Sequence, residues 1–449
     1  MTKGATVFRS AYFVGVGGIG MSALAQYFKD HGVMVSGSDR EASPVTELLE
    51  SKGITVFIGQ KAEQVSADTE VVVYSDAVPP ENPERARAQE LGIPQYSYFE
   101  MLGEVSKGPS TSSGQGRRTV AVAGTHGKTT TTGMLARILG DAGASPTAII
   151  GSIVKDFGSN YLAPSTSLGA GGHDIFVVEA CEYRDHLLEL TPQVLVITNL
   201  EWDHTDYFPS LAALQETFRK AIERVPADGV IVTNPNDANI APCLPVGRRF
   251  SNGPRVIDYT QEPAYELRLP GEFNVMNARA AAAAARVVFP ALSDATLVPS
   301  LAEFQGTWRR FEYKGKTQNG AEVYDDYAHH PTAVRETLKA LREKVKGKIV
   351  VAFHPHLYSR TRDLLDEFAT AFADADQVLL APIYAAREVD DGSISSELLA
   401  ERIRATGTDA VALESFDAIE RELREAGAGT TIMTMGAGDI YKIADTLIV

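Results

Sequence analysis

The sequence predicts an α/β protein made of three α/β units in series. Short, continuous apolar segments alternate with helical segments throughout the 449 residues, a pattern typical of parallel sheets that are covered by helices on both faces. A glycine-rich turn follows an early strand in each of the first two units. At roughly 100–200 residues per domain, a chain of this length accommodates two to four domains, each large enough to bury a core.

The first hundred residues contain the first of these units. We expect strands at residues 12–14, 33–38 and 71–74 and a helix at 22–30, because apolar runs and a helical pattern alternate there. Residues 106–118 are rich in serine and glycine and show no periodicity. This composition predicts a mobile linker between domains.

The second unit follows the expected linker. Its predicted strands are residues 119–123, 175–178, 194–198 and 230–233, and its first helix is predicted at 129–140. The strands are apolar along their whole length, which favours a parallel sheet buried on both faces.

The third unit is expected to begin near Phe311. Its predicted strands are residues 349–353, 378–381 and 431–435, again separated by helical patterns. An alanine-rich run at 278–290 precedes this unit and contains two arginines, which indicates a buried helix.

Composition limits the classes of function. The formal net charge is −16, which argues against general binding to nucleic acid or to a membrane surface, because both attract basic faces. No apolar run reaches the roughly 20 residues that a membrane span needs, and no secretory signal is visible. The only cysteines are Cys181 and Cys243, too few for a disulfide framework, so we expect a reducing, cytoplasmic location.

The most specific motif joins a predicted strand to a predicted helix. Glycines there let backbone N–H groups approach phosphate oxygens, and the helix N-terminus adds partial positive charge. We expect Lys128 to reach the β- and γ-phosphates of a nucleotide and the Thr129 hydroxyl to bind Mg²⁺. The loop is shorter than the common one, because Val122 occupies the position of its first glycine. The motif comprises Gly124, Thr125, His126, Gly127, Lys128, Thr129 and Thr130.

A second glycine-rich turn runs from Gly15 to Gly20, and Asp39 ends the next predicted strand. This arrangement matches the fingerprint of dinucleotide-binding domains, which by itself indicates NAD. Any diphosphate bound at a helix N-terminus needs the same geometry, and UDP also supplies one. A turn with a purely structural role is a third interpretation.

Two groups follow buried strands of the second unit. Glu179 comes directly after the strand at 175–178, and Asp203-His204 lies beyond the strand at 194–198. Ligands of open α/β sheets bind at the carboxyl ends of strands, so Glu179 and His204 are candidate ligands of Mg²⁺, although this ion prefers oxygen. A surface pair without a metal is the alternative.

Histidines concentrate in the motifs instead of being scattered. Of the nine in the chain, six lie in them, and four of these six belong to the segments 325–331 and 354–362. This grouping favours a functional cluster over separate structural hydrogen bonds. Zinc binding is less well supported, because the cysteines lie elsewhere.

Two smaller motifs complete the set. Asn274 and Asn277 offer two amides one helical turn apart before the alanine-rich run. Arg310 lies at the predicted boundary between the second and third units, where an arginine can contact phosphate when domains close or form a surface salt bridge.

In this order and spacing, the motifs resemble those of the Mur ligase family over essentially the whole chain. The resemblance is carried by GVGGIGMSALA, GTHGKTTTT, TNLEWDHTDYF, NVMNARAA, RRFE, DDYAHHPT, HPHLYSRTRDL and MGAGDI. It implies a Rossmann-like, UDP-substrate-binding domain at 1–107. It further implies a P-loop-type ATP-binding domain with a mostly parallel sheet at 108–312, and a Rossmann-like, amino-acid-binding domain at 313–449.

Within the family, the alanine-adding branch is the most similar. That branch implies a ligase dependent on ATP and Mg²⁺, in which ATP phosphorylates the lactyl carboxylate of UDP-N-acetylmuramate. The amine of L-alanine then attacks the acyl phosphate, in a step of peptidoglycan precursor synthesis. The implied partners are these small-molecule substrates, with no nucleic acid and no membrane.

The resemblance also implies roles for single residues. ATP binding is implied for the loop at 124–130 and for Asn274, Asn277 and Arg310. Mg²⁺ binding is implied for Thr129, Glu179 and His204. A catalytic role is implied for Lys128, His204, Arg310, Asp326 and His329. Contacts with the incoming alanine are implied for Tyr327, His356 and Arg360, and contacts with the UDP diphosphate for Gly17, Gly18, Ile19, Gly20 and Ser22, with Asp39 near the ribose.

The sequence departs from the family pattern at three places. After the metal-binding glutamate the family commonly has Ala-Asp-Glu-Ser-Asp, whereas this chain continues as Ala180-Cys181-Glu182-Tyr183-Arg184-Asp185, so its sugar-side contacts differ. Phe273 replaces the usual histidine before Asn274. Phe218 stands where several other members carry a carbamoylated lysine, as expected for a branch that lacks it; Lys220 lies nearby.

Three alternatives remain. A murein-recycling ligase of the same family would attach an intact tripeptide to the sugar. An NAD-dependent oxidoreductase would explain Gly15 to Gly20 and Asp39 but would leave the phosphate loop without a role. A non-catalytic nucleotide or UDP-sugar sensor would not require intact Lys128 and Glu179.

Overall fold

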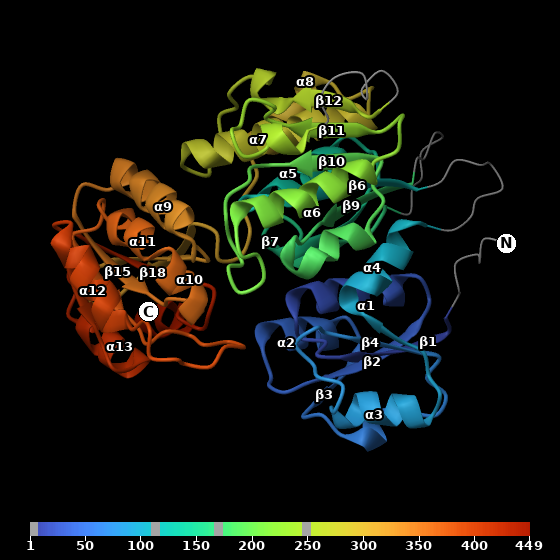
Figure 1. Ribbon diagram of the computed structural model, residues 1–449, viewed down its shortest axis with the longest axis horizontal. Coiled ribbons are helices and arrows are strands. Elements are labelled where there is room, and N and C mark those ends of the chain that lie inside the picture. Colours follow the sequence, from blue (N-terminus) through green and yellow to red (C-terminus); the bar gives the residue numbers. More distant parts are fainter. Residues whose placement is uncertain (1–7, 109–116, 166–173, 245–252) are drawn as a thin grey trace. The chain divides into compact units, whose positions relative to one another are not determined.

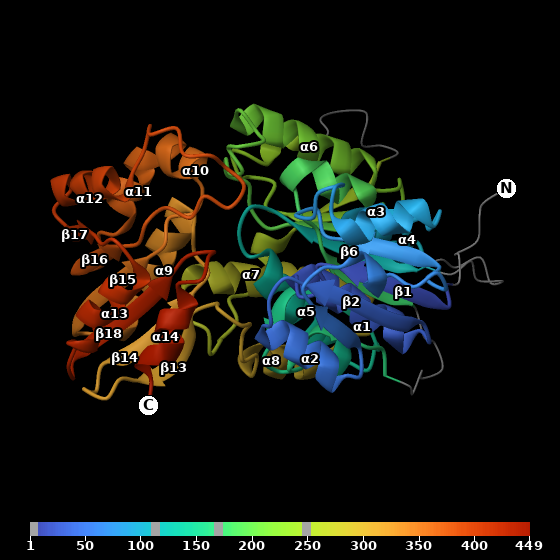
Figure 2. The same cartoon turned by 90° about the horizontal axis from the view of Figure 1, so that it is seen from below.

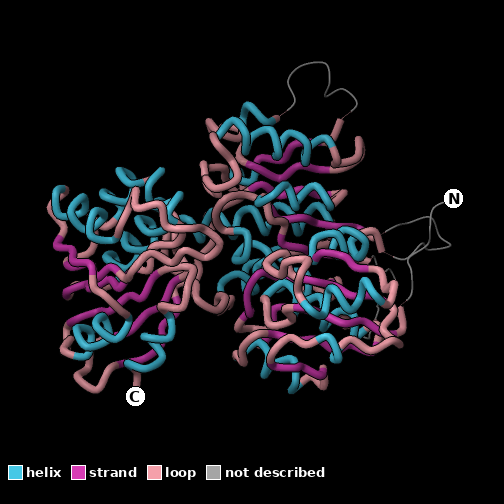
Figure 3. The backbone as a smooth tube through the Cα atoms, turned by 60° about the horizontal axis from the view of Figure 1, so that its bottom comes forward, coloured by secondary structure: helices cyan, strands magenta, loops and turns pink. Residues whose placement is uncertain are grey.

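The computed structural model describes residues 8–108, 117–165, 174–244 and 253–449, and it confirms the predicted α/β class (Figure 1). The described residues form three separate sheets, of which all but two strand pairs are parallel. Figure 3 shows strands of each sheet flanked by helices. Most of the predicted linker, residues 109–116, lies outside the described residues.

The first sheet is entirely parallel and has the strand order β3-β2-β1-β4-β5. The strand order reverses beside β1, and such a reversal places a crevice at the carboxyl ends of the strands. The buried side chains of Tyr12, Phe13 and Val14 hold β1 in the core. The strands are β1 (Ser10–Val14), β2 (Met34–Asp39), β3 (Thr55–Ile58), β4 (Val71–Tyr74) and β5 (Gln95–Ser97), and the helices are α1 (Ile19–Asp30), α2 (Pro44–Ser51), α3 (Pro83–Glu90) and α4 (Tyr98–Ser106).

The second sheet has seven strands in the order β12-β11-β10-β6-β9-β7-β8, with only the β7–β8 pair antiparallel. Its central strands β6, β9 and β10 are almost wholly buried, as expected for continuous apolar strands. The strands are β6 (Arg118–Ala123), β7 (Thr147–Val154), β8 (Ser159–Leu162), β9 (Ile175–Glu179), β10 (Val194–Ile197), β11 (Val230–Thr233) and β12 (Arg255–Asp258); the α-helices are α5 (Lys128–Asp141), α6 (Leu211–Glu223), α7 (Glu272–Val288) and α8 (Asp294–Ala302).

The third sheet has the order β13-β14-β18-β15-β16-β17, with an antiparallel pair at one edge. One apolar core lies under α9, α11 and α12 and another under α13 and α14, so helices cover both faces (Figure 2). The strands are β13 (Glu312–Lys316), β14 (Glu322–Asp326), β15 (Lys348–Phe353), β16 (Gln377–Leu380), β17 (Asp409–Ala412) and β18 (Thr430–Met435); the helices are α9 (Pro331–Lys344), α10 (Tyr358–Asp363), α11 (Leu365–Ala371), α12 (Ser396–Ala405), α13 (Phe416–Arg424) and α14 (Tyr441–Leu447).

A buried polar network joins the first two sheets. The Gln26 amide of α1 donates to Asn160 Oδ1 of β8 at 2.9 Å and accepts from the Ser159 hydroxyl at 3.0 Å. Asn160 in turn donates to Ser22 Oγ at 2.8 Å. All four side chains are almost fully buried, so each must be hydrogen-bonded, and the two sheets share one interior.

The chain accordingly divides into two compact units, which are described separately below. The first contains residues up to Leu200, Gln215–Tyr265 and Met276–Gln305, and the second contains Glu201–Leu214, Glu266–Val275 and Gly306–Val449. The domain limits expected from the sequence, 1–107, 108–312 and 313–449, stay predictions. Within the described ranges, every helix is too short or too polar to span a membrane.

Candidate active site

The loop between β6 and α5 requires glycine at two positions. Gly124 has φ +125° and Gly127 has φ +80°, values that favour glycine. A Cβ at Gly124 would clash with the Thr198 hydroxyl, and one at Gly127 would clash with Asn277 Oδ1. The loop is therefore packed tightly against the end of β10 and the start of α7.

Asn199, just beyond β10, holds the middle of this loop. Its side chain accepts a hydrogen bond from the His126 N–H at 2.9 Å and donates to the His126 carbonyl at 3.0 Å. Helix α5 begins directly afterwards at Lys128, and its N-cap Gly127 supplies no side-chain cap. The first turn of a helix of 14 residues thus presents its N–H groups to the loop, an arrangement that suits phosphate.

Lys128 folds back over the loop. Its ammonium donates to the Gly124 carbonyl at 2.6 Å and lies 2.9 Å from both carboxylate oxygens of Glu182. Burial acts to lower the pKa of Lys128, but neighbouring negative charges, Glu182 foremost, raise that pKa overall. Lys128 is therefore fully charged at neutral pH. Nothing in the sequence indicated this contact of Glu182 except its position three residues after Glu179.

Glu179 and Thr129 form a pair of oxygen donors beside the loop. The Thr129 hydroxyl donates to one oxygen of Glu179 at 3.0 Å, and the Gly151 N–H donates to the other at 2.8 Å. A hydroxyl and a carboxylate at the start of α5 and the end of β9 are the kind of ligand that Mg²⁺ prefers. These two residues therefore fit the ion. His204, the third predicted ligand, belongs to the second unit.

The glycine turn at the start of α1 is fixed by Asp39. One carboxylate oxygen of Asp39 accepts a hydrogen bond from the Gly17 N–H at 2.8 Å. The N-cap Gly18 provides no side-chain cap, so this helix N-terminus also suits a diphosphate. Ser22 has a different environment: its side chain is fully buried and bonds Asn160. Ile19 and Gly20 are partly exposed in the first turn of α1.

In the second unit, the segment after β10 is bound to α10. The Arg360 guanidinium donates to Asp203 at 2.7 Å and contacts His356 Nδ1 at 3.0 Å. Burial would raise the pKa of Asp203, but the charge of Arg360 outweighs it and holds that pKa well below its usual value. His204 follows Asp203 with φ 52°, a backbone conformation uncommon for a non-glycine residue.

His329 and His356 lie near each other, with ring centroids 6.0 Å apart. Burial and the charge of Arg360 lower the pKa of His356 to about 3 and hold that of His329 well below its usual value. Both imidazoles are therefore neutral at pH 7. Tyr327 lies beside His329, with ring centroids 5.4 Å apart. The structure thus brings together four predicted site residues, of which Arg360 is the cation: Tyr327, His329, His356 and Arg360.

Two adjacent arginines have different environments. Arg309 is buried, pairs with Asp325 at 2.8 Å and donates to the carbonyls of Gly436 and Gly438. Arg310 is partly exposed, and its guanidinium lies 5.1 Å from the Tyr327 ring centroid. Arg309 is thus a structural residue, whereas Arg310 is accessible to a ligand.

Asp326 lies at the end of β14 and accepts hydrogen bonds from two backbone N–H groups. These come from Phe311 at 2.6 Å and Ala328 at 2.7 Å. Burial raises the pKa of Asp326, and the charge of Arg310 opposes this shift. The carboxylate therefore fixes the backbone directly after Arg310 and directly after Tyr327.

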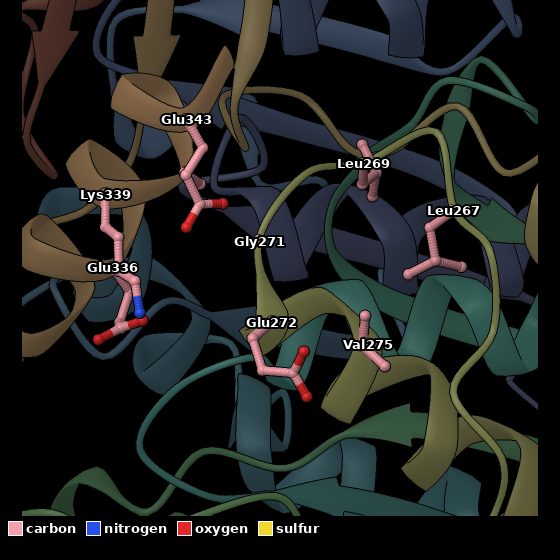
Figure 4. Close-up of a pocket in the computed structure, with 9 residues that line it drawn as sticks. Leu267, Leu269, Gly271, Glu272, Val275, Glu336, Lys339 and Glu343 are labelled. Atoms are coloured by element: carbon pink, nitrogen blue, oxygen red, sulfur yellow. The ribbon is translucent and has the colours of Figure 1, made fainter.

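The segment before α7 lines a cavity of about 520 Å³ in the second unit. Its apolar side chains are Leu267, Leu269, Val275 and Ala340, and Figure 4 shows carboxylates from both α7 and α9 around the opening. Asn274 lies in the same turn and donates to the Pro270 carbonyl at 2.7 Å. Asn277 belongs to the first unit, so the two predicted amides fall in different units.

The three sheets, and the glycine loop that joins β6 to α5, define a multidomain α/β protein. Family models described as the Mur ligase catalytic domain, the Mur ligase middle domain and the Mur ligase glutamate ligase domain match residues 10–108, 122–262 and 309–438. The chain belongs to the Mur ligase family.

Curated relatives resemble the chain over nearly its whole length. A UDP-N-acetylmuramate–L-alanine ligase from Acetivibrio thermocellus is 38% identical over 98% of this chain and 95% of the relative. One from Clostridium acetobutylicum is 35% identical over 98% of this chain and 97% of the relative.

Solved structures agree with this similarity. A UDP-N-acetylmuramate–alanine ligase from Thermotoga maritima is 28% identical, has a TM-score of 0.75 and covers 98% of both chains. A murein peptide ligase from Psychrobacter arcticus is 24% identical with a TM-score of 0.72 over 98% of both chains, a likeness of fold.

Proposed function

We propose that this chain is an ATP-dependent ligase that joins L-alanine to the lactyl carboxylate of UDP-N-acetylmuramate, in the cytoplasmic synthesis of peptidoglycan precursors. The observation that carries the proposal is 35–38% identity, over nearly the full length, to relatives named for this reaction. The phosphate loop at 124–130 agrees with it, because the loop supplies the groups that phosphoryl transfer needs.

The phosphates of ATP would bind at the loop of the first unit. The N–H groups of the first turn of α5 and the ammonium of Lys128 would hold the phosphates. Thr129 and Glu179, together with His204, would hold Mg²⁺, which would neutralise phosphate charge when bound. Asn274 and Asn277 are the proposed contacts for adenine, and Arg310 the proposed contact for the transferred phosphate.

The UDP-sugar would use the N-terminus of α1. The backbone of Gly17, Gly18, Ile19 and Gly20 would contact the diphosphate, since Asp39 already fixes this turn through the Gly17 N–H. Asp39 would then lie near the ribose. Ser22, buried against Asn160, would support the turn from behind.

L-Alanine would use the cluster around Arg360. The two imidazoles are neutral, so Arg360 is the cation of this cluster. Because Asp203 already pairs with Arg360, the carboxylate of the amino acid would have to share the guanidinium with Asp203. His356 and Tyr327 would line the same site, while Asp326 and His329 would act on the ATP side. The reaction then consists of positioning the amine against the acyl phosphate and stabilising the anionic intermediate.

The test is a phosphate-release assay with ATP, Mg²⁺ and UDP-N-acetylmuramate, run with L-alanine, glycine, L-serine and a murein tripeptide. We expect L-alanine to give the highest kcat/KM. Preference for the tripeptide would favour the recycling reaction, and background release with every acceptor would contradict a ligase. A parallel measurement of nicotinamide absorbance tests the oxidoreductase alternative.

A further inference from the structure

Glu182 is a buried carboxylate that lies beside the proposed phosphate site and contacts Lys128. Its side chain is 1% exposed, and both oxygens lie 2.9 Å from Lys128 Nζ. It follows β9 three residues after Glu179. A carboxylate this deeply buried needs its cation, because an unpaired buried charge is strongly unfavourable.

The contacts of Lys128 leave no donor for a ligand. An ammonium has three N–H donors and no acceptor. Four oxygens surround it within hydrogen-bonding distance: the carbonyls of Gly124 and Thr125 and both carboxylate oxygens of Glu182. A phosphate that binds Lys128 must therefore displace at least one of them.

Of these four oxygens, those of Glu182 compete most directly with phosphate. The loop carbonyls are neutral, whereas Glu182 carries the same sign of charge as the incoming phosphate. Two anions that share one cation also repel each other, and they do so strongly where water is excluded. Glu182 thus opposes phosphate binding twice, by occupying Lys128 and by repulsion.

We propose that Glu182 is a positioning residue that holds Lys128 over the loop and gives up part of this contact when phosphate binds Lys128. The inference rests on the proposed function of the loop. As a consequence, the native enzyme binds ADP more weakly than it would if residue 182 carried no charge. Weaker binding favours the release of ADP after each turnover.

The test compares Glu182→Gln with a matched control, Asp156→Asn. The first change keeps the size of the side chain and removes its charge. The control removes a buried carboxylate that pairs with Arg137, the other cation of α5. Calorimetric titration with Mg·ADP, without sugar or amino acid, measures the dissociation constant directly.

We expect Glu182→Gln to bind ADP about 10-fold more tightly than the native enzyme, which corresponds to about 1.4 kcal/mol. The inhibition constant of ADP should fall by the same factor. Asp156→Asn should leave both constants unchanged, and Glu182→Asp, which retains the charge, should restore weak binding. A purely structural Glu182 would give the opposite sign, with a less stable loop and weaker binding.

Unchanged or weaker ADP binding by Glu182→Gln would overturn the inference alone, provided that the native enzyme binds ADP. Absence of binding by the native enzyme would overturn the proposed function as well. Should Glu182→Gln not fold, a crystal structure of the native enzyme with ADP decides. Lys128 Nζ is expected to have lost its contact with at least one carboxylate oxygen of Glu182, and retention of both present contacts would refute the inference.

Discussion

Replacement of Arg309 by methionine should destabilise the second unit far more than the same replacement of Arg310. The Arg309 side chain is 5% exposed, and its partner Asp325 is 1% exposed. Methionine would remove the ion pair and the hydrogen bonds to the carbonyls of Gly436 and Gly438. Loss of one partner from a buried ion pair typically costs about 3–5 kcal/mol, because the other charge stays buried.

The same change at Arg310 should cost at most about 1 kcal/mol, since partly exposed charges contribute little to stability. Urea unfolding followed by tryptophan fluorescence separates the two effects. Both tryptophans of the chain, Trp202 and Trp308, lie in the second unit, so fluorescence reports its unfolding. If the free energy of unfolding of Arg309→Met lay within about 1 kcal/mol of the native value, the structural role of Arg309 would be refuted.

Three further predictions concern the ligands and pH. Lys128→Ala should abolish turnover but leave UDP-sugar affinity, measured by calorimetry, within about twofold; equal loss of both would contradict separate sites. Arg310→Ala should lower kcat more than it raises the KM for the UDP-sugar, and the reverse pattern in steady-state kinetics would exclude a transition-state contact. Burial lowers the pKa of His354 from 6.5 to about 4. The folded state therefore favours neutral His354, and this contribution to stability is fully present above pH 6.5. The free energy of unfolding should fall by up to about 3 kcal/mol as the pH falls from 6.5 to 4. His354→Asn should flatten this part of the stability profile measured by urea unfolding; an unchanged slope would contradict the assignment.

The central strands and the phosphate loop were predictable because local signals determine them. Continuous apolar runs predicted β6, β9 and β10, and each begins or ends within one residue of its expected limit. Two glycines on either side of Thr125-His126, followed by Lys128, indicated the loop, and the structure shows that Gly124 and Gly127 are both sterically required. The sequence pattern is sufficient to predict an element when its backbone conformation and burial depend only on residues close together in the chain.

Edge strands and long-range partners could not be predicted in the same way. The strands β3, β12 and β17 have only four residues each and few buried side chains, so they lack a clear apolar pattern. The pairing of Lys128 with Glu182 joins residues 54 positions apart. The adjacent arginines, Arg309 and Arg310, are identical in sequence terms, and only their three-dimensional environment separates a structural residue from an accessible one.

The hydrogen bonds among Gln26, Asn160, Ser22 and Ser159 have a practical consequence for work with fragments. A protein cut after residue 107 would expose side chains that are buried in the intact chain, and the Gln26 amide would lose its hydrogen bonds with Asn160 and Ser159. Such a fragment should be poorly soluble and a misleading reagent for measuring UDP-sugar affinity. The smallest useful piece is one that retains both sheets together.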